Sequence, residues 1–180
     1  MENYNLSQTI DNLRGPTKEQ IIVQNQWAAV ALDKYHNEST TTIEFSIDKE
    51  ILKAKFNWDS NFSKAAMKEN KDIANHGAVA MAMFVMSVLL DYGYAEQTEI
   101  GDGVDYRFMK KEPNDTDLNF LDNPHYVEVS GILEESKTNT LKGRIKDKHK
   151  QIDNGAKRNE PSSVIVTLFS QLKTTKEKHK

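Results

Sequence analysis

Three consecutive segments decide the fold of this chain: HYVEVSGI at residues 125–132, TLKGRIKDKHKQID at 140–153 and SVIVTLF at 163–169. The first and third are rich in apolar and β-branched residues, which is typical of buried strands. The middle segment places its apolar residues at helical spacing, starts at the candidate cap Thr140 and stops before Gly155. A helix between two strands predicts a right-handed crossover to a parallel neighbour.

Upstream of these segments the pattern predicts one long helix and two further strands. Residues 63–91 have helical periodicity and are apolar nearly all round in their second half, which is typical of a helix buried against a sheet. We expect a joint in this helix at Asn75-His76-Gly77, with His76 as a cap or, alternatively, a site residue. Gly93 is the candidate left-handed cap at its end. Strands are predicted at 94–100 and 104–110, and a polar loop follows at 113–124.

Both termini are less regular. A helix is predicted at 18–34, capped by Thr17, and a half-buried strand at 41–48. Residues 51–62 fit either a short strand or a loop, and we expect the Lys-rich last eleven residues to fray.

The predicted fold class is therefore α/β, a mixed sheet flanked by helices. We expect one domain overall, with an N-terminal helix and strand extension (1–62), an α/β core (63–172) and a basic tail (173–180). The extension could lengthen the sheet or contact a second copy in a homodimer.

Composition narrows the class of protein. The chain has 180 residues and no cysteine, which excludes a disulfide scaffold, a thiol nucleophile and Cys-ligated zinc. No secretory signal is visible at Met1, and the longest apolar stretch is shorter than the roughly 20 residues that span a bilayer. We expect a soluble, cytoplasmic protein with no membrane partner. There is no HExxH, no P-loop and no GxGxxG after a strand.

Charge is unevenly distributed along the chain. The formal net charge is −3, but residues 95–128 carry nine acids against three bases and residues 137–158 carry eight bases against two acids. An acidic block followed at once by a basic block can place a cation site beside a phosphate site. Two solvated faces are the plainer interpretation.

Two acidic residues are candidates for chemistry. Strand alternation turns Asp105 and Arg107 to one side of the second strand, and Glu128 and Ser130 to one side of the third. If the strands are neighbours, Asp105 and Glu128 lie close together, and such carboxylates repel unless a cation intervenes. Mg²⁺ or Mn²⁺ is the natural occupant, and the carbonyl of Val129 could supply a further oxygen. Alternatively, Asp105 faces solvent and Glu128 pairs with Arg107 across the strands.

The helix at 140–153 could supply the other half of such a site. Arg144, Lys148 and Gln151 form a row beside its apolar stripe, at spacings of four and three. Such a row could hold the scissile phosphate or a transition-state charge.

This pattern resembles the PD-(D/E)XK nuclease superfamily. The resemblance covers the order helix, three strands, helix, strand over about half the chain, from residue 75 to 169, and the segments GDGVDY (101–106) and YVEVSG (126–131) carry it. It implies a restriction-endonuclease-like αβββαβ core. It also implies that the protein is a metal-dependent endonuclease or exonuclease, a hydrolase whose expected substrate is nucleic acid and, within that class, DNA. Asp105, Glu128 and Val129 would hold the metal, and Arg144, Lys148 and Gln151 would match auxiliary residues on the helix.

The chain departs from the family pattern at two positions. Val104 stands where the motif has proline, and Ser130 stands in the catalytic motif where the family has lysine. A serine cannot supply that positive charge, so Lys148, or else Lys142 or Lys110, would have to replace it. Otherwise the chain is a non-catalytic module of the same fold that binds nucleic acid or a protein partner.

Overall fold

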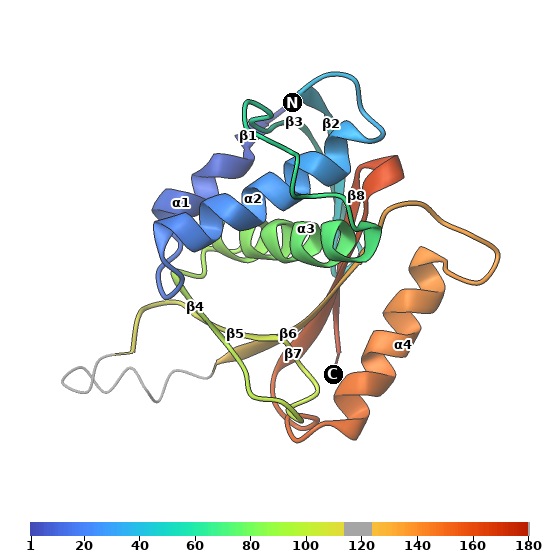
Figure 1. Cartoon of the computed structure of the whole chain (residues 1–180). Helices are drawn as coiled ribbons and strands as arrows, with labels where there is room; N and C mark the ends of the chain where they lie inside the picture. The colour runs from blue at the N-terminus through green and yellow to red at the C-terminus, as the bar shows by residue number, and fades with distance from the viewer. Residues whose placement is uncertain (114–123, 180) are drawn as a thin grey trace.

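A computed structural model of the chain describes residues 1–113 and 124–179. It consists of one mixed sheet with α2 and α3 against one face and α4 against the other (Figure 1). The elements run along the chain as β1 (Asn3–Asn5), η1 (Leu6–Gln8), α1 (Thr9–Asn12), α2 (Lys18–Asp33), β2 (Thr40–Ile47), β3 (Glu50–Asn57), α3 (Asn70–Phe84), η2 (Val85–Leu89), β4 (Tyr94–Gln97), β5 (Tyr106–Met109), β6 (His125–Ile132), α4 (Leu141–Asn154), β7 (Ser162–Leu168), η4 (Phe169–Gln171) and β8 (Lys173–Lys178).

The sheet confirms the predicted α/β class. Its strand order is β1-β3-β2-β8-β7-β6-β5-β4 among the described residues. β4, β5 and β6 pair antiparallel in chain order, and β6 and β7 pair parallel, with Glu128 beside Val164. The crossover helix α4 between two parallel strands is therefore confirmed, and Thr140 caps it by accepting a hydrogen bond from the Gly143 amide.

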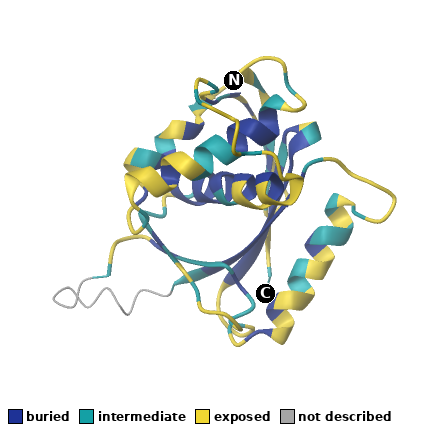
Figure 2. Ribbon diagram, in the orientation of Figure 1, coloured by how far each residue is buried: buried dark blue, intermediate teal, exposed yellow. Residues whose placement is uncertain are grey.

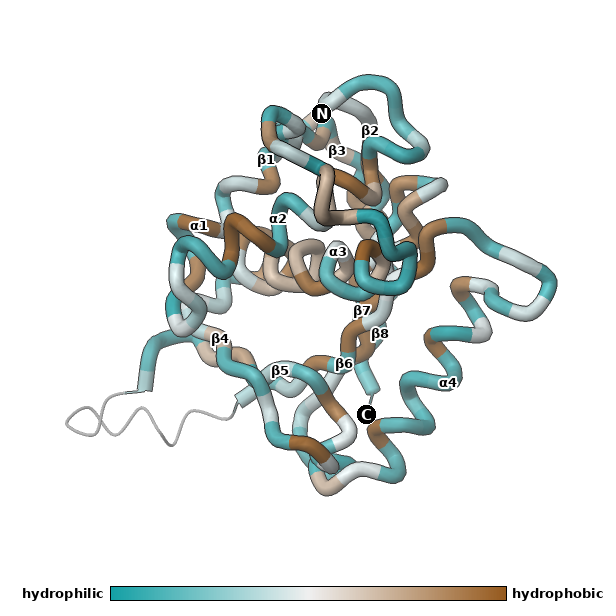
Figure 3. Tube along the Cα trace, in the orientation of Figure 1, coloured by the Kyte–Doolittle hydropathy of each residue, from teal (hydrophilic) through white to brown (hydrophobic). Residues whose placement is uncertain are grey.

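Two helices cover the other face. Thr17 and Gln20 form a capping box at the start of α2, as the sequence predicts. α3 approaches β6 closely, because a Cβ at Gly131 would lie 1.9 Å from the carbonyl oxygen of Ala74. Residues 70–89 are long and apolar enough to cross a membrane, but two thirds of that stretch is buried inside the protein (Figure 2). α4 is far more hydrophilic (Figure 3).

The joint expected at residues 75–77 is wrong. α3 begins at Asn70 and runs unbroken through His76 to Phe84, then continues as the π-helix η2. His76 is therefore no cap. The left-handed residue that follows is Asp91, with φ 57°, and not Gly93. The apolar side chains after residue 77 hold the helix together by burial, which outweighs the low helix propensity of glycine.

Strands from both ends of the chain belong to the same sheet. β2 and β3 form a hairpin, which settles residues 51–57 as a strand, and β1 pairs parallel with β3. The prediction that the last residues fray is wrong: β8 lies between β2 and β7 in the middle of the sheet. It thereby joins the N-terminal strands to the core. Most of the loop predicted at 113–124 lies outside the described residues.

Candidate functional site

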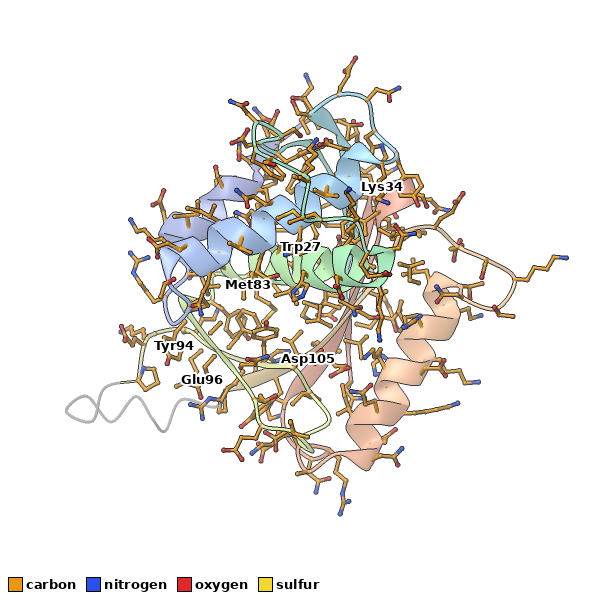
Figure 4. The ribbon with its side chains drawn as sticks, in the orientation of Figure 1. Trp27, Lys34, Met83, Tyr94, Glu96 and Asp105 are labelled. Carbon is orange, nitrogen blue, oxygen red and sulfur yellow. The ribbon has the colours of Figure 1, made fainter. Side chains whose placement is uncertain are left out.

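A cleft of about 750 Å³ opens between α3, the start of α2, strands β4 to β6 and α4. The predicted site residues Asp105, Val129, Ser130, Arg144 and Lys148 all line it. Figure 4 shows Asp105 below α3, with Met83 above it and Tyr94 toward β4. The acidic and basic blocks of the sequence therefore meet at one cavity.

β6 presents different side chains to its two faces. Val127 and Val129 pack in the core under α2 and α3, whereas Tyr126 and Ile132 pack in the core under α4. This alternation confirms the faces predicted for the third strand and sends Glu128 to the α4 side. Glu128 is fully buried there, with a relative exposure of 0%.

Asp105 immediately precedes β5, at the level of Glu128 in the neighbouring strand. Its amide donates to the carbonyl of Val127 (2.9 Å), and its Oδ2 accepts from the amide of Val129 (2.7 Å). The carboxylate thus replaces a backbone partner just before β5 begins, which fixes its position against β6. Strand alternation from residue 104 would turn Val104 to the face of Phe108. Val104 packs instead in the core under α4, because the strand begins only at Tyr106.

Lys148 meets Glu128 from the other side. Its Nζ lies 2.5 Å from Glu128 Oε1 and 3.1 Å from Gln151 Oε1. An ammonium has three N–H donors. Two of those of Lys148 are used in these contacts, so one N–H has no partner among the described residues. The Lys148 side chain lines the cleft. The lysine named as the substitute for the motif lysine therefore lies beside the motif carboxylate.

The electrostatics of Glu128 follow from these neighbours. Burial and the nearby Asp105 carboxylate raise the pKa of Glu128 to about 7, while the Lys148 ammonium opposes the rise. The Asp105 carboxylate is therefore close enough to Glu128 to affect its titration. Oε2 of Glu128 is buried and has no hydrogen-bond partner among the described residues.

The remaining candidates fall in different places. Arg144 lines the cleft and donates to the side chain of Asn139. Gln151 does not line this cleft and instead orients Lys148. Ser130 is buried at the cleft surface.

The alternative partners are engaged elsewhere. Arg107 forms its ion pair with Glu96 and not with Glu128, so that alternative is wrong. Lys110 donates to the carbonyl of Leu90 and lies 4.2 Å above the Tyr92 ring. Of the lysines named in place of the motif lysine, Lys148 is the one that contacts Glu128.

On the opposite wall of the cleft, the sequence named only His76, as the alternative to a helix cap. His76 stacks on Trp27 with ring centroids 5.4 Å apart and an interplanar angle of 28°. Gln24 lines the same wall, and its side-chain oxygen is buried with no hydrogen-bond partner in residues 1–113 or 124–179. Tyr106 borders the wall, and burial raises its pKa to about 12, so the phenol stays protonated at neutral pH. The spacing of four between Gln20 and Gln24 was the signal in the sequence, since it puts both on one helix face.

The site offers oxygen ligands and cations together. Among the described residues no group of three or more His, Cys, Asp or Glu side chains could hold a metal ion. Mg²⁺, however, is commonly held by one or two carboxylates, with water and substrate phosphates completing its shell. Asp105 and Glu128 are such a pair, with Lys148 and Arg144 placed to meet an anion.

Comparisons of the chain with protein-family models, with curated proteins and with solved structures found no match.

Proposed function

We propose that this protein is a metal-dependent nuclease that hydrolyses phosphodiester bonds in DNA. The observation that carries the proposal is the buried Glu128 carboxylate, which lies beside Asp105 and Lys148, two residues that line the cleft. Raised carboxyl pKa values beside a charged partner in a cleft are typical of active sites. The resemblance in element order and motif supports the same conclusion.

The residues fit a divalent ion. Oε2 of Glu128 is a buried acceptor without a hydrogen-bond partner among the described residues, and Asp105 is near enough to affect its titration. Both are hard oxygen ligands of the kind that Mg²⁺ and Mn²⁺ prefer. A metal held by Asp105 and Glu128 would polarise the phosphodiester and offset charge that develops on it.

The side chains of this protein would perform the remaining tasks. Lys148 and Arg144 bind the phosphate oxygens, and Gln151 holds the Lys148 ammonium in place. In the hydrolysis an oxygen of water bonds to phosphorus, the ester P–O bond breaks, and the departing oxygen takes up a proton. The fixed charges around the cleft stabilise the transition state without reorganising.

The alternative is a non-catalytic module that binds nucleic acid or a protein. Ser130 at the position of the motif lysine favours it, together with the Lys148 ammonium that already neutralises Glu128. Such a module needs no metal, so metal binding separates the two functions.

The test compares the wild type with Glu128→Gln and with the matched control Glu134→Gln, an exposed acid just after β6. We expect Mg²⁺- or Mn²⁺-dependent DNA cleavage by the wild type and the control, reduced on the order of 100-fold in Glu128→Gln. Calorimetric Mn²⁺ titration should show binding that this variant loses. Equal cleavage by both variants, or no cleavage and no metal binding by the wild type, would reject the proposal.

A further inference from the structure

The cleft continues well beyond the acidic residues. One end holds Asp105, Lys148 and Arg144, and the other is walled by aromatic and amide side chains from α2 and α3, among them Gln24 and His76. Phosphodiester hydrolysis needs the charged end alone. The second end is therefore a feature that the proposed function leaves without a role.

We propose that this second end binds the base of an unpaired nucleotide, so that the preferred substrate is single-stranded nucleic acid. The phosphate of that nucleotide lies at Lys148 and Arg144, and its base lies against His76 and Gln24. The position of the phosphate rests on the proposed function, whereas the base site rests on the wall itself.

Stacking is the first part of the argument. The His76 ring is exposed toward the cleft and lies on Trp27, which is partly buried. The ring is therefore supported from behind and offers its other face. Flat rings held in this way are the platforms on which proteins stack unpaired bases, of any sequence.

Hydrogen bonding is the second part. The buried oxygen of Gln24 has no partner in the described part of the chain, and an unsatisfied acceptor of this kind is costly unless a ligand fills it. Asn75 and Gln97 also line the cleft. Amide groups present donors and acceptors together, and they match the base edges that pairing would occupy in a duplex.

Size is the third part. A cleft of about 750 Å³ lies inside the roughly 300–1,000 Å³ range of pockets for single small ligands. Its floor carries the buried side chains of Met83 and Ala95, which suit the apolar face of a base. One nucleotide fits such a pocket, and a paired base reaches it only after leaving its stack.

The experiment measures binding in EDTA with Glu128→Gln as the background, so that no strand is cut. A fluorescein-labelled short oligodeoxythymidine, a blunt hairpin duplex and thymidine 5′-monophosphate are the probes. We expect the single strand to bind about tenfold more tightly than the duplex, and Gln24→Leu or His76→Ala each to weaken single-strand binding by about tenfold. Gln26→Leu, on the same helix but outside the cleft lining, is the matched control and should change nothing.

A second readout locates the base. The chain has two tryptophans, so Trp58→Phe leaves Trp27 as the sole one. We expect the oligonucleotide to quench Trp27 emission, and His76→Ala to abolish the quenching. Because the His76 side chain is exposed, this variant keeps its fold, and thermal unfolding checks that it does.

Several outcomes would overturn the inference. Equal affinity for the two DNA forms, unchanged binding by both cleft variants, or a complete lack of competition by thymidine 5′-monophosphate, which carries both a phosphate and a base, would each do so. Cleavage of both DNA forms at equal rates with Mg²⁺ would also reject the base site while leaving the nuclease intact. Selective single-strand binding without any metal-dependent cleavage would support the base site and reject the nuclease.

Discussion

Glu128 is a charged residue in the middle of an apolar strand. Its carboxyl has no exposed surface, and its pKa is raised to about 7 by burial and by Asp105. Taking a carboxylate out of water is expensive, and the Lys148 ammonium offsets part of that cost. The pair therefore does not explain stability, and its Lys148 member lines the cleft.

At the residue scale we predict the effect of removing one partner of this pair. Lys148→Ala leaves the Glu128 charge unpaired, and should lower the free energy of unfolding by roughly 3 kcal/mol at pH 8. At pH 5 the loss should be much smaller, because Glu128 then takes up a proton. Urea unfolding at the two pH values measures both.

The double variant Lys148→Ala/Glu128→Gln should recover most of the stability lost at pH 8, since no buried charge remains. Lys150→Ala is the matched control, because Lys150 pairs with Asp147 at the surface, and such pairs contribute little. A loss that is the same at both pH values, or no recovery in the double variant, would contradict the prediction.

β8 is the element that joins the two halves of the sheet. Thr175 pairs with Ser46 of β2 on one side and with Val166 of β7 on the other. The buried Lys176 of this strand is neutralised by Asp48, whose Oδ2 lies 2.7 Å from the Lys176 Nζ. A central strand uses its backbone amides for hydrogen bonds to the strands on both sides. Its side-chain hydroxyls also need hydrogen-bond partners when they are buried.

At the element scale we predict opposite effects of two substitutions at one position. The Thr175 hydroxyl is buried with no hydrogen-bond partner among the described residues. Thr175→Val should therefore raise the free energy of unfolding by about 1 kcal/mol. Thr175→Pro should lower it by about 3 kcal/mol or more, because it removes an amide from the ladder. Thermal unfolding followed by circular dichroism measures both, and a mild effect of proline would refute the central place of β8.

Across the whole molecule, the pKa values of the partly buried His125 and the buried Glu128 shift in opposite directions. Burial lowers the pKa of His125 from 6.5 to about 4, with the Lys176 ammonium adding to the effect. Its ring also lies 2.8 Å from the Ser163 hydroxyl. The lowered pKa stabilises the fold above pH 6.5, and this stability is lost as the pH falls toward 4. The raised pKa of Glu128 contributes stability below pH 4.5, which is lost as the pH rises through 7.

At this scale we predict that the two effects largely cancel in the wild type between pH 4.5 and 6.5. The wild type loses the stability contributed by Glu128 as the pH rises from 4.5 to 7, and Glu128→Gln does not. The free energy of unfolding of this variant, measured relative to the wild type, should therefore rise by on the order of 2–3 kcal/mol over this range. His125→Gln should lose a similar amount between pH 4 and 6.5. Denaturant unfolding in EDTA across this range measures both differences, and Glu134→Gln should run parallel to the wild type. Slopes of the opposite sign would refute the assignment.

Local pattern was enough for most of the elements. β6, α4 and β7 lie within one residue of their predicted bounds, because their side-chain period and caps are local properties of the chain. The same period placed Glu128 on the face of its strand opposite to Val127 and Val129. The sequence therefore determined the α/β class and named the carboxylates and the lysine that meet.

Only the tertiary structure decided the rest. The sequence predicts a frayed tail for the Lys-rich C-terminal residues, because Asp48, which neutralises Lys176, lies 128 residues earlier in the chain. The sequence leaves His76 as either a helix cap or a site residue, because its stacking partner, Trp27, belongs to another helix. Ion pairs between residues far apart in the chain, and the far wall of a cleft, arise only when folding packs distant elements together. The local spacing of apolar residues does not encode which elements will pack together.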